Sequence, residues 1–258
     1  MSGDWLFPLT LTFMLGLRFL GLLMVSPALT VPSMPIAARF WLALLLALAA
    51  LPMVLGQAFP PNLTAPLALI LACTREFFIG ATLGFLSALP LYAMEMAGWL
   101  IGVSMGFGMV NVLDPLSQVQ TSVIGQLKFL LGLWFFLHWN GHILLFQGLM
   151  ESFRLFPLAQ VEWSFAEDPQ VATWLREAFY LAVKITLPFY GALLLADIGL
   201  GFIARTVPQL NVFILGLPLK VLLGFLMLMM VLPAAVDLIH GEIEDALELA
   251  MKGAALWH

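Results

Sequence analysis

Long apolar segments follow one another along this sequence, and each is long enough to cross a membrane as a helix, which takes about 20 predominantly apolar residues. Hydrophobic residues make up 62% of the 258 positions and charged residues only 10%, whereas a soluble domain is about one quarter charged. Because the chain cannot bury so much apolar surface within itself, lipid or partner proteins must cover the rest. The sequence therefore predicts an all-α, polytopic membrane protein. The segments are roughly Trp5–Val31, Ile36–Leu55, Pro66–Val110, Val123–Met150, Val171–Ala204 and Val212–Val236.

Two of these segments are too long for a single straight crossing. A continuous helix over Pro66–Val110 would reach about 65 Å, and one over Val171–Arg205 about 50 Å, at 1.5 Å per residue. The hydrocarbon core of a bilayer is only about 30 Å thick. We therefore expect either breaks at Pro90 and Pro188 or long, kinked helices that project beyond the bilayer.

Charged residues interrupt or border the apolar segments, where facing lipid at the bilayer centre costs roughly 2.5–3.5 kcal/mol each. Few of them lie three or four residues from an opposite charge, so pairing within one helix does not account for them. We expect them to face water, protein or one another, with partners from elsewhere in the fold or from other subunits. They are Arg75, Glu76, Glu95, Lys128, Lys184, Asp197, Arg205 and Lys220.

Sequence patterns of enzymes and cofactor sites are not found. The chain has no HExxH, P-loop, GxSxG or dinucleotide-binding pattern, so we expect no enzymatic activity and no cofactor. The single cysteine, Cys73, cannot form an internal disulfide and is expected to be a small buried residue. His138 and His142 have the spacing of a helical metal pair, but Asn140–Gly141 between them is typical of a turn. We therefore expect a turn and no metal site.

The net charge of −5 is concentrated near the C-terminal end, and no basic patch typical of nucleic-acid binding is present. The simplest interpretation of the acidic end is a solvated helix end, and docking to a basic partner is the alternative. No positively charged stretch precedes the first apolar segment, so we expect a retained helix there and no cleaved signal peptide. The acidic end contains Asp237, Glu242, Glu244, Asp245 and Glu248, opposed by Lys252.

Three glycines, Gly98, Gly102 and Gly106, recur at four-residue intervals. This small-xxx-small spacing lets another helix backbone approach closely. The spacing predicts tight helix packing immediately before the least regular part of the chain.

That irregular part begins at Gly106 and ends at Ser122. Its glycines lower helix propensity, and its Asn, Asp and Pro residues are typical of turns. Non-helical backbone at membrane depth is tolerated only when it is buried in protein or lines a water-filled cavity. The segment is therefore either a connecting loop outside the membrane or a loop inserted into a pore. In the second case an apolar constriction is formed by Phe107, Met109, Val110, Val112 and Leu113.

The stretch from Arg205 to Lys220 is also distinctive. Pro208, Gln209 and Asn211 indicate the tip of a hairpin between two long helices. The stretch is either a satisfied turn followed by a kinked helix, or a polar seam that contacts neighbouring subunits.

Several motifs together resemble the FliR/SctT family of type III export-gate subunits, over nearly the whole chain. The motifs SFRLFPL and PQLNVFILGLPLK look more like the flagellar branch than like the injectisome branch. The motifs are REFFIGATLGF (75–85), AGWLIGVSMGFGMVNVLDPLSQVQ (97–120), GQLKFLL (125–131), NGH (140–142), SFRLFPL (152–158) and PQLNVFILGLPLK (208–220).

The resemblance implies a non-enzymatic subunit of the flagellar export gate, in the bacterial inner membrane at the flagellar basal body. One such subunit joins five FliP-like and four FliQ-like subunits around a channel for unfolded flagellar proteins. FlhB-like and FlhA-like export proteins are further partners. The resemblance also implies that residues 1–165 form a FliP-like part and residues 171–258 a FliQ-like helical hairpin.

Roles for particular residues follow from the same resemblance. Residues 106–122 match the family's channel plug, and Gly98 and Gly102 are helix-packing positions. The plug residues are Gly106, Phe107, Gly108, Met109, Val110, Asn111, Val112, Leu113, Asp114 and Pro115. Residues expected at subunit contacts or lining the gate are Arg75, Glu76, Glu95, Lys128, Asp197, Arg205, Gln209, Asn211 and Lys220.

Other functions remain open at this point. One is the equivalent subunit of an injectisome. Another is a proton-coupled secondary transporter, since broken helices and embedded charges are typical of transporters. Transporters usually repeat their broken helices, however, and the GFGMVNVLDP pattern occurs once. A membrane enzyme is a further class, but no nucleophile, base and orienting group are grouped in the sequence.

Overall fold

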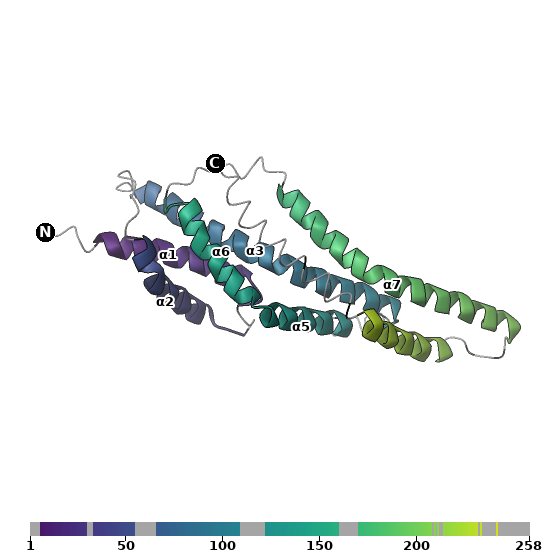
Figure 1. The fold of residues 1–258 in the computed structure, drawn as a ribbon. Coiled ribbons are helices and arrows are strands. Elements are labelled where there is room, and N and C mark those ends of the chain that lie inside the picture. Colours follow the sequence, from purple (N-terminus) through teal and green to yellow (C-terminus); the bar gives the residue numbers. More distant parts are fainter. Residues whose placement is uncertain are drawn as a thin grey trace. The chain divides into compact units, whose positions relative to one another are not determined.

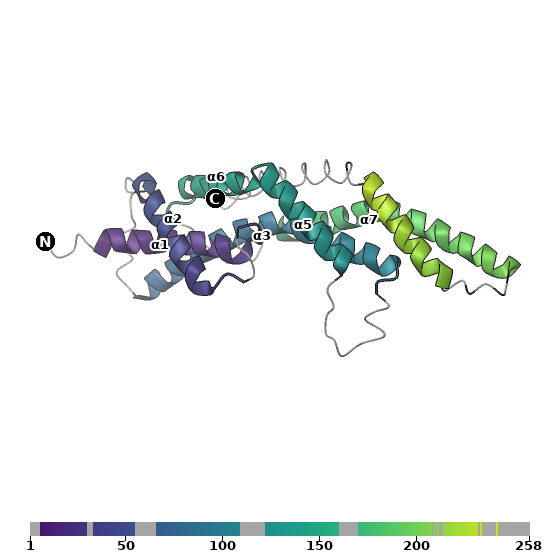
Figure 2. The ribbon, with the colours of Figure 1, turned by 90° about the horizontal axis from the view of Figure 1, so that it is seen from below.

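A computed structural model describes residues 6–29, 33–54, 66–108, 122–159, 170–207, 209, 211, 214–231, 233 and 241. Within these residues the regular structure is entirely helical (Figure 1, Figure 2), which confirms the predicted fold class. The helices are α1 (Leu6–Val25), α2 (Ile36–Val54), α3 (Pro66–Ser104), α5 (Val123–His138), α6 (Gly141–Leu155) and α7 (Gln170–Thr206), followed by a helix over Ile214–Val231.

Five of the described helices are long and apolar enough to cross a membrane. The helices α5 and α6 are joined by a break at which the axis bends by 66°, and together they make a sixth candidate. These lengths follow from the hydrophobic pattern, because a helix that spans lipid needs an apolar surface along its whole length. The chain is therefore a polytopic membrane protein.

The two overlong helices do not end at their prolines. The 39-residue α3 continues past Pro90, and the 37-residue α7 continues past Pro188. At 1.5 Å per residue, each helix is more than 50 Å long, or roughly twice the hydrocarbon thickness. Of the two expected arrangements, the structure therefore has long helices that exceed a bilayer.

The chain divides into two compact units, and each combines segments distant in the sequence. Unit 1 takes its described residues from Met1–Leu89 and Phe136–Val171, and unit 2 from Pro90–Phe135 and Ala172–Glu242. Both α3 and α5 contribute to both units. The expected likeness of residues 1–165 and 171–258 to two other kinds of subunit is a separate matter and stays a prediction.

In unit 1, α1 packs against α2 and makes backbone contact with α3. A Cβ atom at Gly80 would overlap the carbonyl oxygen of Arg18, and one at Gly21 would overlap the carbonyl oxygen of Phe77. Glycines at such a crossing let two helix backbones approach closely. The side chains of Met14, Leu15, Phe19 and Leu22 are fully buried around this crossing.

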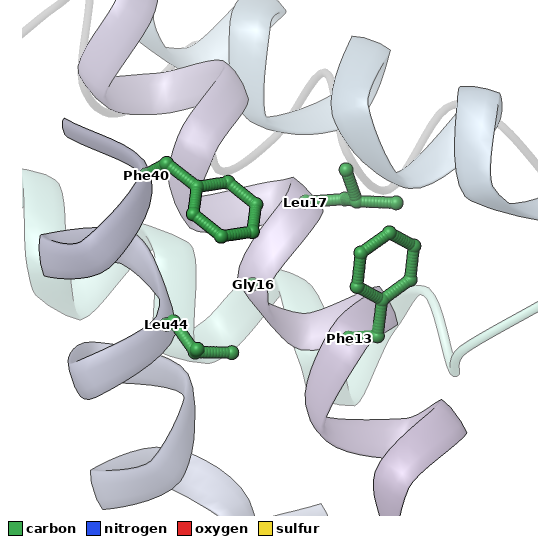
Figure 3. A pocket seen from close by; sticks show the side chains of 5 residues that line it. All are labelled: Phe13, Gly16, Leu17, Phe40 and Leu44. Carbon is green, nitrogen blue, oxygen red and sulfur yellow. The ribbon is translucent and has the colours of Figure 1, made fainter. Parts of the chain in front are cut away.

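A small apolar pocket lies between α1 and α2 (Figure 3). It is lined by Phe13, Gly16, Leu17, Phe40 and Leu44. These lining residues, which belong to the described part of the chain, carry no titratable or nucleophilic side chain.

In unit 2, the buried core consists of Ile101, Met105, Ile124, Phe189 and Leu193. These residues come from α3, the turn after it, α5 and α7. The helix over Ile214–Val231 packs against this core through one face. Only 17% of the apolar window of α7 and 11% of Ile214–Val231 are buried within the chain. Most of the surface of these two helices is therefore available to lipid or to other proteins.

Candidate functional site

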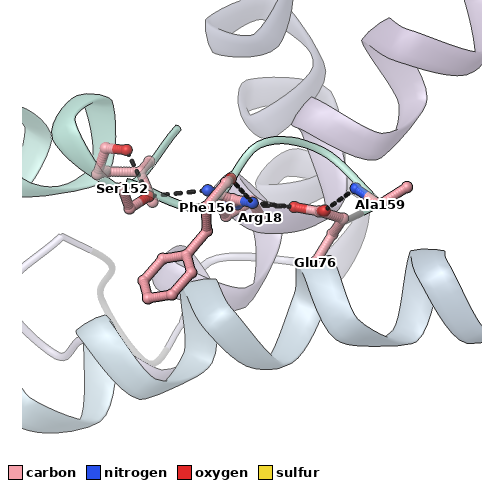
Figure 4. Close-up of polar contacts among 6 residues, drawn as sticks. Arg18, Glu76, Ser152, Phe156 and Ala159 are labelled. Carbon is pink, nitrogen blue, oxygen red and sulfur yellow. Dashed lines mark hydrogen bonds and ion pairs between the residues drawn. The ribbon is translucent and has the colours of Figure 1, made fainter. Parts of the chain in front are cut away.

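A buried ion pair joins α1 to α3 in unit 1 (Figure 4). The Nη2 atom of Arg18 lies 2.6 Å from Oε2 of Glu76, and Nε of Arg18 donates a hydrogen bond of 2.7 Å to the same oxygen. The two side chains are 0% and 1% exposed. Burial of this kind is tolerated only where the charges are paired and their remaining hydrogen-bonding capacity is used.

Residues at the end of α6 use that remaining capacity. Arg18 Nη1 donates to the hydroxyl of Ser152 and Nη2 to the carbonyl oxygen of Phe156, each over 3.1 Å. The backbone N–H of Ala159 donates to Oε1 of Glu76, also over 3.1 Å. In addition, the guanidinium carbon lies 4.4 Å from the centre of the Phe153 ring. We call Arg18, Glu76, Ser152, Phe156 and Ala159 the buried polar cluster.

Glu76 is the one predicted site residue in this cluster, and its neighbour Arg75 is half-buried. The sequence analysis did not select Arg18, although it is the only charge in the 20 residues of α1. A lone arginine in an apolar helix is itself a signal, because it needs a buried partner. Gly80 and Gly84 were also missed, although they have the same four-residue spacing as Gly98 and Gly102.

The structure places the glycine face of α3 directly against the start of α5 in unit 2. A Cβ atom at Gly98 would lie 2.6 Å from the carbonyl oxygen of Ile124, and one at Gly102 would lie 2.7 Å from Oγ of Ser122. A Cβ atom at either position would therefore be too close to its neighbour, so a larger residue would require the neighbouring segment to shift.

Lys128 is buried on α5, with its Nζ atom 4.9 Å from the centre of the Phe189 ring on α7. A cation over an aromatic face is attracted by the ring quadrupole, most strongly where water is excluded. Glu95 is half-buried on α3, and its backbone carbonyl lies beside Gly125, one turn before Lys128. These two predicted residues thus belong to the contact region of α3, α5 and α7.

A second ion pair joins α7 to the helix over Ile214–Val231. Lys220 Nζ lies 2.6 Å from Oδ1 of Asp197, and the side chains are 23% and 50% exposed, respectively. Asn211 precedes the second helix, and its carbonyl oxygen accepts a 3.0 Å hydrogen bond from the N–H of Ile214, the first residue of that helix. Three predicted residues are exposed between the end of α7 and the start of this helix, namely Arg205, Gln209 and Asn211. The predicted residues of the hairpin therefore lie at its tip and between its two helices.

The predicted plug is described only at its two ends, residues 106–108 and Ser122. After α3 the chain forms a turn over residues 105–108, with Gly106 in the left-handed region at φ 97°. The N–H of Phe107 donates to the carbonyl oxygen of Gly102 over 3.0 Å, as in glycine-based helix ends. Met109, Val110, Asn111, Val112, Leu113, Asp114 and Pro115 lie outside the described residues, as does the acidic C-terminal end.

The structure confirms the predicted turn at Asn140–Gly141. Asn140 has φ 59° and ψ 26°, and it stands between His138 at the end of α5 and His142 in the first turn of α6. The two histidines thus lie on either side of a bend. Among the described residues, no group of three or more His, Cys, Asp or Glu side chains is placed to hold a metal ion.

Comparison with known proteins identifies relatives over most of the chain. The model of the family described as bacterial export proteins, family 1, matches residues 9–246. The chain is 36% identical to a flagellar biosynthetic protein FliR of Bacillus subtilis (strain 168) over 172 residues, which cover 66% of each chain. It is 29% identical to the FliR of Escherichia coli (strain K12) over 232 residues, 90% of this chain and 88% of that one. It is also 29% identical over 239 residues to the secretion system apparatus protein SsaT of Salmonella typhimurium, with 90% of each chain covered.

Proposed function

Because this chain belongs to the bacterial export proteins, family 1, and is a membrane component of a type III export apparatus, we propose that it is the FliR-like subunit of a flagellar export gate. The observation that carries this proposal is the similarity to curated FliR proteins over up to 90% of the chain. The subunit is a non-enzymatic, channel-forming part of the inner-membrane basal body, and it helps to pass unfolded flagellar proteins.

The surface of unit 2 supports membership of a larger assembly. Asp197 is half-exposed, yet it lies on a helix whose apolar window is only 17% buried. A charge facing lipid at the bilayer centre is unfavourable by roughly 2.5–3.5 kcal/mol. Neighbouring subunits would cover the ion pair of Asp197 with Lys220 and the apolar surface around it.

The proposed neighbours are five FliP-like and four FliQ-like subunits, with FlhB-like and FlhA-like proteins as further partners. Native mass spectrometry of the full chain co-expressed with the FliP-like and FliQ-like proteins tests this composition. We expect one copy of this chain in a complex with five and four copies of the others. A monomer, or a symmetric dimer that excludes the other two proteins, would overturn the proposal.

We propose in addition that residues 106–122 plug the channel. The left-handed Gly106 ends α3, so the helix stops where the plug begins. Deletion of residues 106–116 should make membranes permeable to small ions while the complex stays assembled. Replacement of residues 109–115 by a Gly–Ser linker of the same length keeps the length of the loop but removes its apolar side chains, and it should also leak. Unchanged permeability in both intact complexes would refute the plug.

The equivalent subunit of an injectisome is the second candidate, since SsaT is 29% identical over 90% of the chain. Complementation separates the two possibilities. The gene should restore motility to a flagellated host that lacks its own FliR, and it should not restore secretion to a host that lacks the injectisome subunit. The reverse pattern would assign the chain to an injectisome.

A further inference from the structure

The buried polar cluster holds both ends of one short turn. The carbonyl oxygen of Phe156 accepts from Arg18, and the N–H of Ala159 donates to Glu76. We propose that Arg18 is a positioning residue, which through its pairing with Glu76 fixes the turn from Phe156 to Ala159 against α1 and α3. The cluster's part in gate assembly rests on the proposed function, whereas the position of the turn does not.

The turn needs such support because its backbone is not held by a regular helix. The helix α6 ends at Leu155, and Phe156 has φ −121° and ψ 87°. The last carbonyl groups of a helix have no partner within it, and cations are favourable near this end. Ala159 has φ 62°, a left-handed conformation that residues other than glycine seldom adopt. Arg18 and Glu76 thus bind the two backbone groups at the ends of the turn.

The geometry of arginine suits this task. Its Nε, Nη1 and Nη2 atoms donate to groups of α3, α6 and the turn at the same time. A planar guanidinium presents its donors in fixed directions, whereas a lysine ammonium is a compact charge on a flexible stem. Arginine at position 18 can therefore fix three segments relative to one another.

The ion pair could only neutralise charge, or it could also position the turn, and these two roles predict different behaviour when the pair is replaced. A buried ion pair that only neutralises charge can often be replaced by two apolar residues of similar volume without loss of stability. The double variant Arg18→Met/Glu76→Met should therefore fold. If the pair also positions the turn, this variant should release residues 156–159 while α6 itself stays in place.

Thiol labelling of the full-length chain measures this release. The only native cysteine is removed by Cys73→Ala, and Leu158→Cys then reports on the turn, since Leu158 is 2% exposed. Leu149→Cys is the matched control within α6, since Leu149 is 0% exposed. We expect the double Met variant to raise the labelling rate at position 158 at least tenfold and to leave position 149 unchanged. Equal, slow labelling at position 158 with and without the pair would overturn the proposal.

Milder variants decide the matter if the double variant loses its fold, which would appear as fast labelling at both positions. Arg18→Lys keeps the charge but cannot hold three segments, so it should accelerate labelling at position 158 alone. Ser152→Ala removes one acceptor and should have a smaller effect in the same direction. Slow labelling at position 158 in the folded Arg18→Lys protein would contradict the positioning role.

The link to gate assembly is measured separately, by co-purification with FliP-like and FliQ-like proteins. If the double Met variant is stably inserted in the membrane and its turn is released at position 158, the amount of complex recovered with it should fall at least tenfold. Normal recovery would reject the assembly role alone, while the labelling result would still stand. If the native chain itself fails to recover these partners, the proposed function is wrong and the positioning role is judged by labelling only.

Discussion

The contact between α1 and α3 predicts that Gly80→Ala destabilises the protein, although alanine is the better helix former. A Cβ atom at position 80 would overlap the carbonyl oxygen of Arg18 and lie 2.7 Å from its carbonyl carbon and 3.0 Å from the backbone nitrogen of Leu22. All of these are backbone atoms of α1, so no side chain can rotate away. The helix α1 must shift, and it carries the guanidinium of Arg18 with it.

The magnitude follows from two opposing effects. Overpacking of a well-packed core costs about 1–3 kcal/mol, and replacing glycine by alanine within a helix gains about 1 kcal/mol. A shift of Arg18 away from Glu76 adds to the cost, because an uncompensated buried charge is strongly destabilising. We expect a net loss of about 1–3 kcal/mol. At about 2–4 °C per kcal/mol for a chain of 150–250 residues, the melting temperature should fall by several degrees.

Gly191 on α7 is the matched control, because among the described residues an added Cβ there has no atom within 4 Å apart from the nearby backbone of α7 itself. Gly191→Ala should therefore gain up to about 1 kcal/mol from helix propensity alone. The assay is thermal unfolding of the purified full-length chain in detergent, followed by tryptophan fluorescence. The two alanine variants should shift the melting temperature in opposite directions. If Gly80→Ala is as stable as Gly191→Ala, the two helix backbones are not in contact at Gly80.

Two further outcomes are expected. Asn140 has φ 59°, and a β-branched residue in this left-handed conformation is strained. In the same thermal assay, Asn140→Gly should leave the melting temperature unchanged or raise it slightly, whereas Asn140→Val should lower the stability by roughly 1–2 kcal/mol. Equal stability of the two variants would contradict that backbone conformation. Lys220→Glu places a second carboxylate beside Asp197 and should block co-purification with the FliP-like and FliQ-like subunits. The swapped variant Asp197→Lys/Lys220→Glu should recover at least part of the complex. Normal recovery of the complex with the single variant would show that Lys220 is not needed for the subunit contact.

The helices were predictable from the sequence where the physical cause is local. The apolar segment Ile36–Leu55 corresponds to α2 at Ile36–Val54, since continuous hydrophobicity sets the length of a membrane helix. The turn at Asn140–Gly141 was predictable because asparagine tolerates the left-handed conformation. The sequence left open whether α3 breaks at Pro90 or continues past it. The helix continues, because helix packing and local adjustment can compensate for the hydrogen bond that proline removes.

The buried polar cluster could not be predicted from local pattern. Arg18 pairs with a residue 58 positions away and also contacts residues 134 and 138 positions away. Glu76 was predicted to need a partner from elsewhere in the fold or from another subunit, and the structure supplies Arg18, the only charge in α1. Similarly, Asp197 and Lys220 were each predicted to need partners, but their pairing with each other depends on how α7 meets the next helix.

The Arg18–Glu76 and Asp197–Lys220 ion pairs differ in a way that bears on function. Arg18 and Glu76 are fully buried, and each of their charged atoms named above has a hydrogen-bond partner. Buried charges whose hydrogen-bonding capacity is used in this way suit a fixed scaffold. Asp197 and Lys220, by contrast, are partly exposed on helices that bury 17% and 11% of their apolar windows within the chain. Exposed charge beside exposed apolar surface favours contact with other protein subunits over a transporter that works alone.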